Sequence, residues 1–328
     1  MKIEKARQEN FANLCEFNSR IYPEKITESK HYLKFWLTKQ DAKLDDWLIL
    51  KDGDGAIHGQ ILASPMSYYF KGIRNNTVWL FDLIVDEELR KSAWGVDMLL
   101  QCMETHPASC STGSGPTALP LHLKLGNKML GEIRKYVGVV NPFYLLTAYH
   151  RKEVAIEKFP QEIVIGKSQY WKITKEELPS FDAPFNEGLF EIGRDKDFLE
   201  WRFFGNLFRY VFYLADDGKS YFVVRSILLK GFRVLELVDY RCKATKGEFE
   251  KILKAVHKAA NAVYLPVVVC GSTLASFDAV LEHHHYRSMG RPRPVIGFVK
   301  CKDRKEDIAQ RNFCFVTFAD SDGETNWI

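Results

Sequence analysis

Residues 78–100 read VWLFDLIVDEELRKSAWGVDMLL: an apolar run, a short basic turn and a segment with helical spacing. The apolar run predicts a strand that ends at Val85, and the later segment predicts an amphipathic helix. Its buried face is expected at the spacing i, i+3, i+4, i+7, which selects Val96, Leu99, Leu100 and Met103. The start of a helix exposes unpaired backbone N–H groups and the positive end of its dipole. The stretch therefore favours an anion such as a phosphate at this turn, although an ordinary strand-to-helix connection is the plain alternative.

The residues of the turn suit such a role. Arg90 and Lys91 add positive charge, and Ser92 and the small residues after it allow a close backbone approach. The pattern Arg90-x-x-Ala93-x-Gly95 resembles the Arg/Gln-x-x-Gly-x-Gly/Ala pyrophosphate loop of the GNAT acetyltransferases. That resemblance implies an acyl-coenzyme A ligand, with acetyl-CoA as the expected donor. The family's first glycine is Ala93 here, which fits the loop only if its φ is negative.

The same resemblance assigns the cofactor contacts. In GNAT enzymes the backbone of the strand before the loop pairs with the pantetheine arm and polarises the thioester carbonyl. The matching strand positions are apolar and also suit a plain core strand. The residues expected to bind the cofactor are Leu83, Ile84, Val85, Arg90, Lys91, Ser92, Ala93, Trp94, Gly95 and Val96.

Acyl transfer to an amine needs a path that removes a proton from the amine, a donor for the developing oxyanion and an acid for the departing thiolate. Asp82, three residues before Val85, is the candidate base, acting directly or through water. The alternative is a structural carboxylate that accepts hydrogen bonds from backbone or arginine groups.

The candidate acid is a histidine. Ala118-x-x-Leu121-His122-x-x-x-Gly126-Asn127 resembles the family pattern Asn-x-x-Ala-x-x-Leu-Tyr-x-x-x-Gly-Phe, with His122 in place of the tyrosine that often acts as general acid. An unperturbed histidine has a pKa of about 6.5 and can protonate a thiolate. The alternative is a solvated histidine on a helix surface. Pro120 is expected to shorten or kink the helix.

Composition limits the class of protein. The 328 residues are 46% hydrophobic and 13% aromatic, which fits a globular chain of two domains. The net charge of +4 is spread along the chain, so no nucleic-acid partner is expected. No apolar run approaches the roughly 20 residues of a membrane span, and no membrane partner is expected. The seven cysteines form no C-x-x-C pair, which indicates a reducing compartment, and we expect a cytoplasmic protein.

The second half of the chain repeats features of the first. Strands ending in Asp86 and Asp239 are 153 positions apart, and each precedes a predicted helix. The second helix is expected to bury Phe249, Ile252, Leu253 and Val256. Each half also contains a predicted hairpin, at 47–70 and 210–229. The pattern indicates a diverged duplication.

The element order, hairpin, strand, helix, strand, helix, strand, is similar to that of a GNAT fold. We therefore predict an α/β (α+β) protein of two tandem GNAT-like units, each a mixed, mainly antiparallel twisted sheet flanked by helices. The expected divisions are a cofactor-binding domain at 1–155, a connecting segment at 156–185 and a second domain without the loop pattern at 186–328. Bacterial tandem GNAT proteins are the nearest resemblance.

In the second half, Thr245 and Glu248 resemble a capping box, which satisfies a helix start without a phosphate. This half is expected to shape the acceptor side of a cleft, with candidate lining residues Trp201, Arg202, Tyr240 and Arg241. The run His283–His285 is expected to end a helix and not to bind a metal, because consecutive helical residues point about 100° apart.

Three functions remain open at this stage. The leading hypothesis is an acyl-CoA-dependent N-acyltransferase that acetylates an amine of a small molecule or sugar. The alternatives are a degenerate, non-catalytic binding protein and an aminoacyl-tRNA-dependent transferase of the peptidoglycan-bridge type. The sequence specifies neither the acceptor nor the oligomeric state.

Overall fold

The computed structural model describes residues 1–22, 29–106, 108–115, 118–299 and 314–320. The chain divides into two compact units. Unit 1 comprises 1–68, 75–130 and 294–311, and unit 2 comprises 69–74, 131–293 and 312–328. Each unit is therefore assembled from separate stretches of the sequence.

Unit 1 is a mixed sheet with helices on both faces. Its strands are β1 (Lys2–Lys5), β2 (Leu48–Lys51), β3 (Ile57–Phe70), β4 (Ile73–Val85) and β5 (Ala108–Thr112). Its helices are α1 (Phe11–Ile21), α2 (Ser29–Leu37), α3 (Trp94–Thr105) and α4 (Ala118–Lys124). The strands follow the order β1-β2-β3-β4-β5, with β4 parallel to β5 and β2 antiparallel to its neighbours. The predicted hairpin of β2 and β3 is confirmed.

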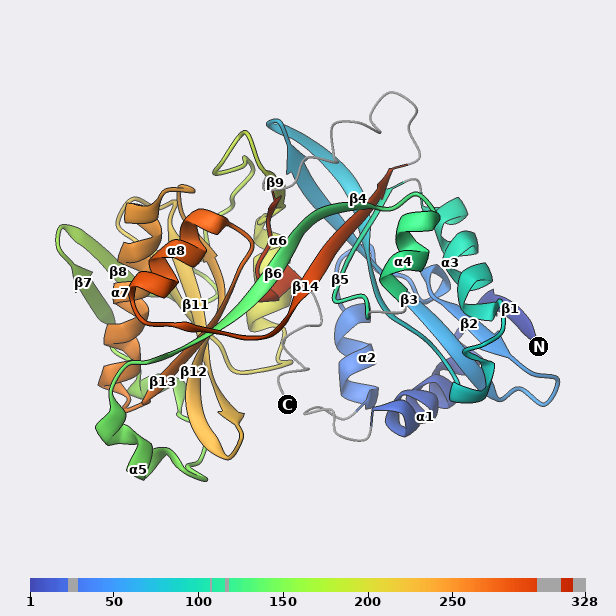
Figure 1. The fold of residues 1–328 in the computed structure, drawn as a ribbon, viewed down its shortest axis with the longest axis horizontal. Helices are drawn as coiled ribbons and strands as arrows, with labels where there is room; N and C mark the ends of the chain where they lie inside the picture. The colour runs from blue at the N-terminus through green and yellow to red at the C-terminus, as the bar shows by residue number, and fades with distance from the viewer. Residues whose placement is uncertain (23–28, 107, 116–117, 300–313, 321–328) are drawn as a thin grey trace. The chain divides into compact units, whose positions relative to one another are not determined.

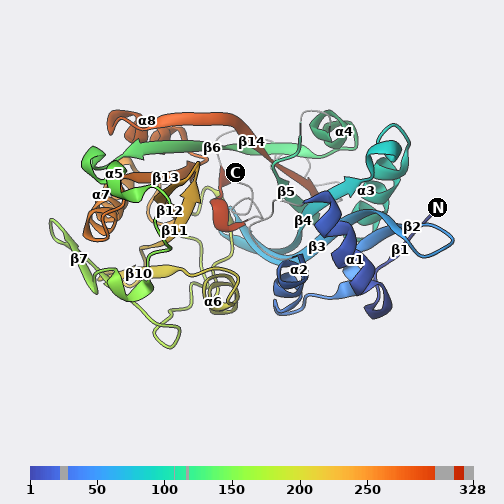
Figure 2. The same cartoon turned by 90° about the horizontal axis from the view of Figure 1, so that it is seen from below.

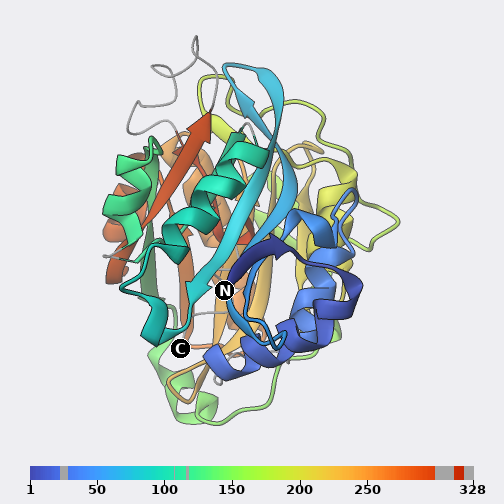
Figure 3. The same cartoon turned by 90° about the vertical axis from the view of Figure 1, so that its right-hand side faces the viewer.

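The core of unit 1 lies on both sides of β4. On one face, Leu80 packs with Met98 and Leu99 of α3. On the other face, Phe81 contacts Trp36 of α2 with ring centroids 4.3 Å apart. Figure 3 looks onto this unit, with α3 in teal across the strands and α1 and α2 in blue.

The predicted buried face of α3 was partly wrong. Leu99 and Met103 are buried as expected, but Met98 and Cys102 complete the face, while Leu100 is 39% exposed and Val96 is half-buried. A single i, i+3, i+4, i+7 series does not fix the centre of the stripe when apolar residues occur on neighbouring positions.

Unit 2 contains the larger sheet. Its strands are β6 (Lys128–Val139), β7 (Glu162–Ile165), β8 (Ser168–Lys172), β9 (Phe190–Ile192), β10 (Val211–Ala215), β11 (Tyr221–Leu229), β12 (Phe232–Arg241), β13 (Val267–Ser272), β14 (Arg287–Val299) and β15 (Cys314–Phe315). Its helices are α5 (Leu145–Ala148), α6 (Lys196–Phe204), α7 (Lys246–Ala262) and α8 (Ala275–His283). The order β6-β13-β12-β11-β10-β8-β7 has one parallel pair, β12 with β13, among otherwise antiparallel pairs.

Helices cover both faces of this sheet. The helices α7 and α8 pack on one face around Phe249 and Phe277, whose rings stack 4.2 Å apart, and α6 lies on the other (Figure 2). All four apolar residues predicted for the buried face of α7 are fully buried, so that prediction is confirmed. The helix α8 ends at His283, as predicted for the histidine run.

Two long strands carry the chain between the units. The strand β6 follows α4 in the sequence, but its residues 134–139 pair with β13 in unit 2. The strand β14 follows α8, but its residues 295–299 pair with β5 in unit 1. Figure 1 shows both as long ribbons, green and red. The sequence did not predict this exchange, and the domain limits at 155 and 185 stay a prediction.

The order hairpin, strand, helix, strand, helix, strand occurs in both halves of the sequence, while the division into two tandem units stays a prediction. The expected connection at 156–185 contains β7 and β8, which join the sheet of unit 2 through β10. No helix in the described part of the chain is long and apolar enough to cross a membrane. The mixed, mainly antiparallel fold class is confirmed.

Candidate functional site

The strands β4 and β5 part close to the predicted cofactor loop. They are paired at Val78 with Ser109 and at Trp79 with Cys110. Within the described residues, no pairing with β5 is found for the last residues of β4, from Leu83 to Val85. The backbone on that edge of β4 is therefore available to a ligand over the positions predicted to hold the pantetheine arm.

A bulge at Asp82 accompanies this separation. Asp82 has φ of 50°, in the left-handed region that non-glycine residues rarely adopt. In a regular strand Leu80 and Leu83 would point to opposite faces, yet Leu83 packs against the same core cluster as Leu80. The bulge therefore shifts the side-chain alternation and turns the backbone after Asp82. The Asp82 side chain is half-buried.

The other edge of β4 is held tightly by β3. A Cβ atom on Gly59 of β3 would lie 2.9 Å from Val85 Cγ1 and 3.2 Å from the Ile84 carbonyl oxygen. The Asp86 N–H also donates to the His58 carbonyl at 2.8 Å. The last residues of β4 are therefore fixed against β3 while their other edge is unpaired with β5.

The start of α3 lacks a side-chain cap. Ala93 is the N-cap residue, with φ of −76° and no capping hydrogen bond from its side chain. The condition for alanine in the loop, a negative φ, is thus met. The Ser92 hydroxyl, one position before the N-cap residue, accepts a hydrogen bond of 3.4 Å from the Trp94 N–H. The dipole and N–H groups of the first turn remain available to an anion.

The loop side chains leave room in front of this helix start. Arg90, Lys91, Ser92 and Ala93 are exposed, and Trp94, Gly95 and Val96 are half-buried. A Cβ on Gly95 would meet no atom within 4 Å. The structure therefore brings the predicted loop residues together around an open helix start, with two cations beside it.

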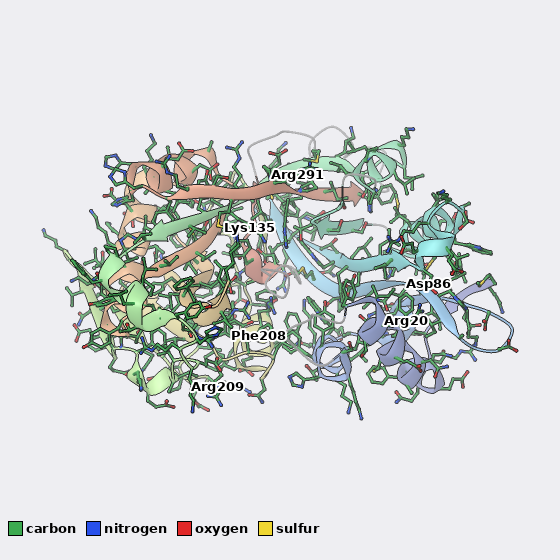
Figure 4. The ribbon with its side chains drawn as sticks, turned by 60° about the horizontal axis from the view of Figure 1, so that its bottom comes forward. Arg20, Asp86, Lys135, Phe208, Arg209 and Arg291 are labelled. Atoms are coloured by element: carbon green, nitrogen blue, oxygen red, sulfur yellow. The ribbon has the colours of Figure 1, made fainter. Side chains whose placement is uncertain are left out.

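A polar cluster anchors the loop where β4 ends. The Asp86 carboxylate accepts hydrogen bonds from Arg20 of α1 at 2.8 and 3.2 Å and contacts His58 Nδ1 at 2.9 Å. His58 Nε2 lies 3.1 Å from Asp52 Oδ2. The hydrogen bond with Asp52, aided by Asp86, raises the pKa of His58 against the opposing effect of burial. Figure 4 shows Arg20 and Asp86 beside each other. The separation of these residues in sequence hid this cluster from motif analysis.

His122 is not on a solvated surface, so the solvated interpretation was wrong. It is 5% exposed, and its Nδ1 atom has no hydrogen-bond partner in the described structure. Burial lowers its pKa to about 4. Pro120 occupies the first turn of the seven-residue α4, where its missing N–H breaks no helical hydrogen bond. The imidazole is neutral near pH 7.

The corresponding connection in unit 2, from β12 to α7, has a side-chain cap at the start of its helix. The Thr245 hydroxyl accepts from the Glu248 N–H at 3.4 Å, which confirms half of the predicted capping box. The Glu248 carboxylate instead pairs with Lys251. The strand β12 keeps its pairing with β13 at Leu235 to Leu237.

Unit 2 carries buried charges that motif analysis missed. Arg194 forms two hydrogen bonds with Asp239 and contacts Asp320, and all three are buried. Arg225 pairs with Glu236 at 2.5 Å on the same face of the sheet. Burial, with Arg293 nearby, lowers the pKa of Lys135 to about 7. No motif marks these residues, because their partners lie on separate strands.

The four residues predicted to line an acceptor cleft are all buried within unit 2. Arg202 donates to the Ala319 carbonyl at 2.8 Å. Tyr240 and Arg241 line a small pocket together with Glu191, Arg194 and Tyr221. The Arg241 guanidinium lies over the Phe181 and Phe185 rings at 4.4 and 4.5 Å. In the described part of the chain, no group of histidine, cysteine or acidic residues is arranged to hold a metal ion.

Comparison with solved structures identifies proteins that have a similar fold. A GCN5-related N-acetyltransferase from Anabaena variabilis matches 92% of this chain and 73% of its own, with 13% identity and a TM-score of 0.59. N-myristoyltransferase from Saccharomyces cerevisiae with bound myristoyl-CoA matches 94% and 85%, with 14% identity and a TM-score of 0.57. A probable N-acyltransferase of unknown function from Enterococcus faecalis matches 91% and 72%, with 12% identity and a TM-score of 0.59.

Neither family models nor curated protein sequences gave a match to this chain. The structural matches extend over most of the chain at low identity, so they establish the fold and not the activity. The chain has the GNAT fold, the architecture shared by these N-acetyl- and N-myristoyltransferases.

Proposed function

We propose that the protein is an acyl-CoA-dependent N-acyltransferase whose donor binds to unit 1. The observation that carries the proposal is the parting of β4 from β5 after Trp79, directly before an uncapped helix start. A strand edge that is not paired with β5 from Leu83 to Val85 suits the amide-bearing pantetheine arm, and the helix start suits the pyrophosphate. The structural neighbours support a coenzyme A thioester, since one of them holds myristoyl-CoA.

The predicted loop residues then take complementary roles. Arg90 and Lys91 neutralise the phosphate charges, and the N–H groups of Gly95 and Val96 lie in the first turn of α3. The backbone from Leu83 to Val85 holds the pantetheine arm and orients the thioester carbonyl. These assignments rest on the position of each residue beside the unpaired edge or the helix start.

The catalytic roles remain proposals. Asp82 lies at the bulge of β4 and is the candidate acceptor of the amine proton, which it takes directly or through water. We keep His122 as the proposed proton donor to the thiolate. Its lowered pKa makes it neutral near pH 7, so it suits that role less well than an ordinary histidine.

We propose acetyl-CoA as the donor and an amine of a small molecule or sugar as the acceptor. A longer acyl chain is the alternative, because myristoyl-CoA occupies a neighbour of the same fold. None of the six cysteines in the described residues forms a disulfide bond, which supports a cytoplasmic location. Titration with acetyl-CoA and myristoyl-CoA in parallel decides the length of the acyl group. We expect acetyl-CoA to bind at least about tenfold more tightly than myristoyl-CoA.

A second candidate function is binding without transfer. Ala93 in place of the family's glycine and the neutral His122 favour it. An assay for free thiol, run with acetyl-CoA and a panel of amines, separates the two functions. Binding of the donor without amine-dependent release of coenzyme A supports the non-catalytic function.

The decisive experiment compares Gly95→Trp with Gly247→Trp. Both glycines are second residues of their helices, and a Cβ on either meets nothing within 4 Å, so both variants are expected to fold. An indole at position 95 would fill the space in front of α3, whereas one at 247 lies at the capped helix. Thermal unfolding is measured with and without acetyl-CoA.

We expect the ligand to stabilise wild type and Gly247→Trp equally, by about 2.7 kcal/mol at one hundred times the Kd. Gly95→Trp should lose this stabilisation and unfold at the same temperature as wild type without ligand. A wild type that gains nothing, or a Gly95→Trp variant that gains as much as wild type, contradicts the proposed cofactor site.

A further inference from the structure

Three segments of unit 2 meet at one end of its sheet. The first contains α5, the second is the turn between β11 and β12, and the third follows α7. The His150 N–H donates to the Gly231 carbonyl at 2.8 Å, and the Tyr149 and Phe232 rings lie 5.2 Å apart. Arg151 donates to the carbonyls of Val263 and Tyr264 at 3.0 and 3.1 Å. Figure 1 shows α5 and the β11–β12 turn at this end.

This end exposes an unusual amount of apolar surface. Phe143 is 81% exposed and Leu146 is 89% exposed, although each lies in a structured turn of helix. Six of the twelve large apolar side chains that are exposed in the described residues occur here. We define the α5 patch as these six: Val139, Phe143, Leu146, Tyr149, Leu228 and Tyr264. A cluster of this kind marks an interaction surface more than scattered exposed residues do.

The charges around the α5 patch are mostly positive. Residues 139–153, 228–233 and 261–266 contain four cations and a single carboxylate, Glu153. The cations are Arg151, Lys152, Lys230 and Arg233. Lys152 and Lys230 are exposed, and Arg151 and Arg233 are half-buried. Apolar side chains that protrude beside exposed cations are typical of proteins that bind anionic lipid headgroups.

We propose that the α5 patch docks this protein on an anionic membrane surface. Phe143 and Leu146 would enter the boundary between headgroups and acyl chains, and Lys152 and Lys230 would contact the headgroups. A second copy of the chain fits less well, because a symmetric pairing of this patch would bring the same cations against one another. The anionic surface is complementary in both its apolar and its charged parts.

This inference revises the expectation that the protein has no membrane partner. That expectation used the length of apolar runs, which tests only for a segment that spans the bilayer. Docking on a surface needs a few protruding apolar side chains from folded segments and a basic rim, and no long apolar run. The inference does not depend on the proposed acyltransferase activity.

The test is co-sedimentation of the full-length protein with vesicles. One set contains phosphatidylcholine alone, and the other contains phosphatidylcholine with about one third phosphatidylserine. The apolar variant is Phe143→Ser with Leu146→Ser, and the charge variant is Lys152→Glu with Lys230→Glu. The control is Val164→Ser with Trp171→Ser, which removes two exposed apolar side chains from β7 and β8, outside the α5 patch.

We expect wild type and the control to bind the anionic vesicles, and both test variants to bind at least about tenfold more weakly. Binding of wild type should weaken as salt is added. Equal binding to both vesicle types, or unchanged binding by the Phe143 and Leu146 variant, overturns the proposal. A concentration-dependent dimer that the same variant abolishes, without vesicle binding by wild type, also overturns it and assigns the patch to a second copy.

Discussion

The two strand-to-helix connections, β4 to α3 and β12 to α7, occupy equivalent places in the sequence but differ in structure. Asp86 follows the end of β4, whereas Asp239, 153 positions later, lies inside β12, which ends at Arg241 and not at Asp239 as predicted. The strand β12 pairs with β13 at Leu235 to Leu237. The residues 153 positions before Glu236 and Leu237 are Leu83 and Ile84, for which no pairing with β5 is found in the described structure. The start of α7 is capped by Thr245, while α3 has no side-chain cap.

The two aspartates show the same contrast. The Asp239 side chain is fully buried and accepts from Arg194, Tyr221 and Thr317. The Asp86 side chain is 13% exposed, and its partner Arg20 is 53% exposed. The aspartate in β12 is thus part of a buried polar cluster of unit 2, whereas the aspartate after β4 pairs with a partly exposed arginine beside a helix start that has no side-chain cap. The difference teaches that two connections of the same element order can differ in how their polar groups are satisfied, and on our proposal only the connection before α3 binds a ligand.

The largest expected effect comes from breaking the buried ion pairs of Asp239 and Asp320 in unit 2. Arg194→Met leaves Asp239 and Asp320 buried without their cation, so unfolding should become easier by about 3–5 kcal/mol. Arg20→Met removes the equivalent surface pair and should cost less than about 1 kcal/mol. Urea unfolding measures both. If Arg194→Met does not fold, Arg194→Lys, which keeps the charge, provides the comparison, and a loss no larger than that of Arg20→Met contradicts the contrast.

The next effect disturbs the end of β4 from the side of β3. Gly59→Ala would place a methyl group 2.9 Å from Val85 Cγ1 and so push the end of β4 out of position. We expect a loss of about 1–3 kcal/mol in the free energy of unfolding, and weaker binding of acetyl-CoA. Gly53→Ala, in the open turn of the same hairpin, is the control and should change neither quantity for the worse. Undiminished donor affinity in Gly59→Ala speaks against a ligand on this part of β4.

Removing the N-cap of α7 tests whether side-chain capping stabilises the start of α7 more than the start of α3. Thr245→Ala loses the hydrogen bond to the Glu248 N–H and should lower the free energy of unfolding by about 1 kcal/mol. Ser92→Ala, before α3, should cost less than half of that, because Ser92 lies one residue before the N-cap residue Ala93 and does not cap the helix. Chemical unfolding measures the loss in the free energy of unfolding for both variants. Equal losses would show that both helix starts depend on a side chain.

The smallest effect is a pH dependence of the free energy of unfolding, caused by His58 beside the end of β4. The pKa of His58 is raised chiefly by its hydrogen bond to Asp52, with a further contribution from Asp86. The stabilisation by this group is fully present below its unfolded pKa, about 6.5, and is lost as the pH rises through the raised folded value. The free energy of unfolding should therefore fall as the pH rises above about 6.5, by less than about 1 kcal/mol after solvent screening. His58→Gln should flatten this slope, and an unchanged slope in that variant assigns the pH dependence to other groups.

Much of the local structure was predictable from periodic patterns. The end of β4 at Val85, the hairpin of β2 and β3, the cap at Thr245 and the buried face of α7 each depend on residues close in sequence. The face of α3 was predicted less well, because adjacent apolar residues leave the centre of the stripe undetermined. The position of His122 in a short helix was also predicted, but not its burial, which depends on the packing around it.

The sequence by itself determined the two hairpins, the order of strands and helices that follows each of them, and the small, basic turn before α3, since these follow from residue spacing, turn chemistry and helix capping. Tertiary structure alone decided that β4 leaves β5 after Trp79, that β6 and β14 each exchange between units, and that Arg194 meets Asp239 and Asp320. The physical reason is distance along the chain. Pairing between remote strands and burial of remote charges are set by the packing of the whole fold, and no local pattern encodes which partners meet.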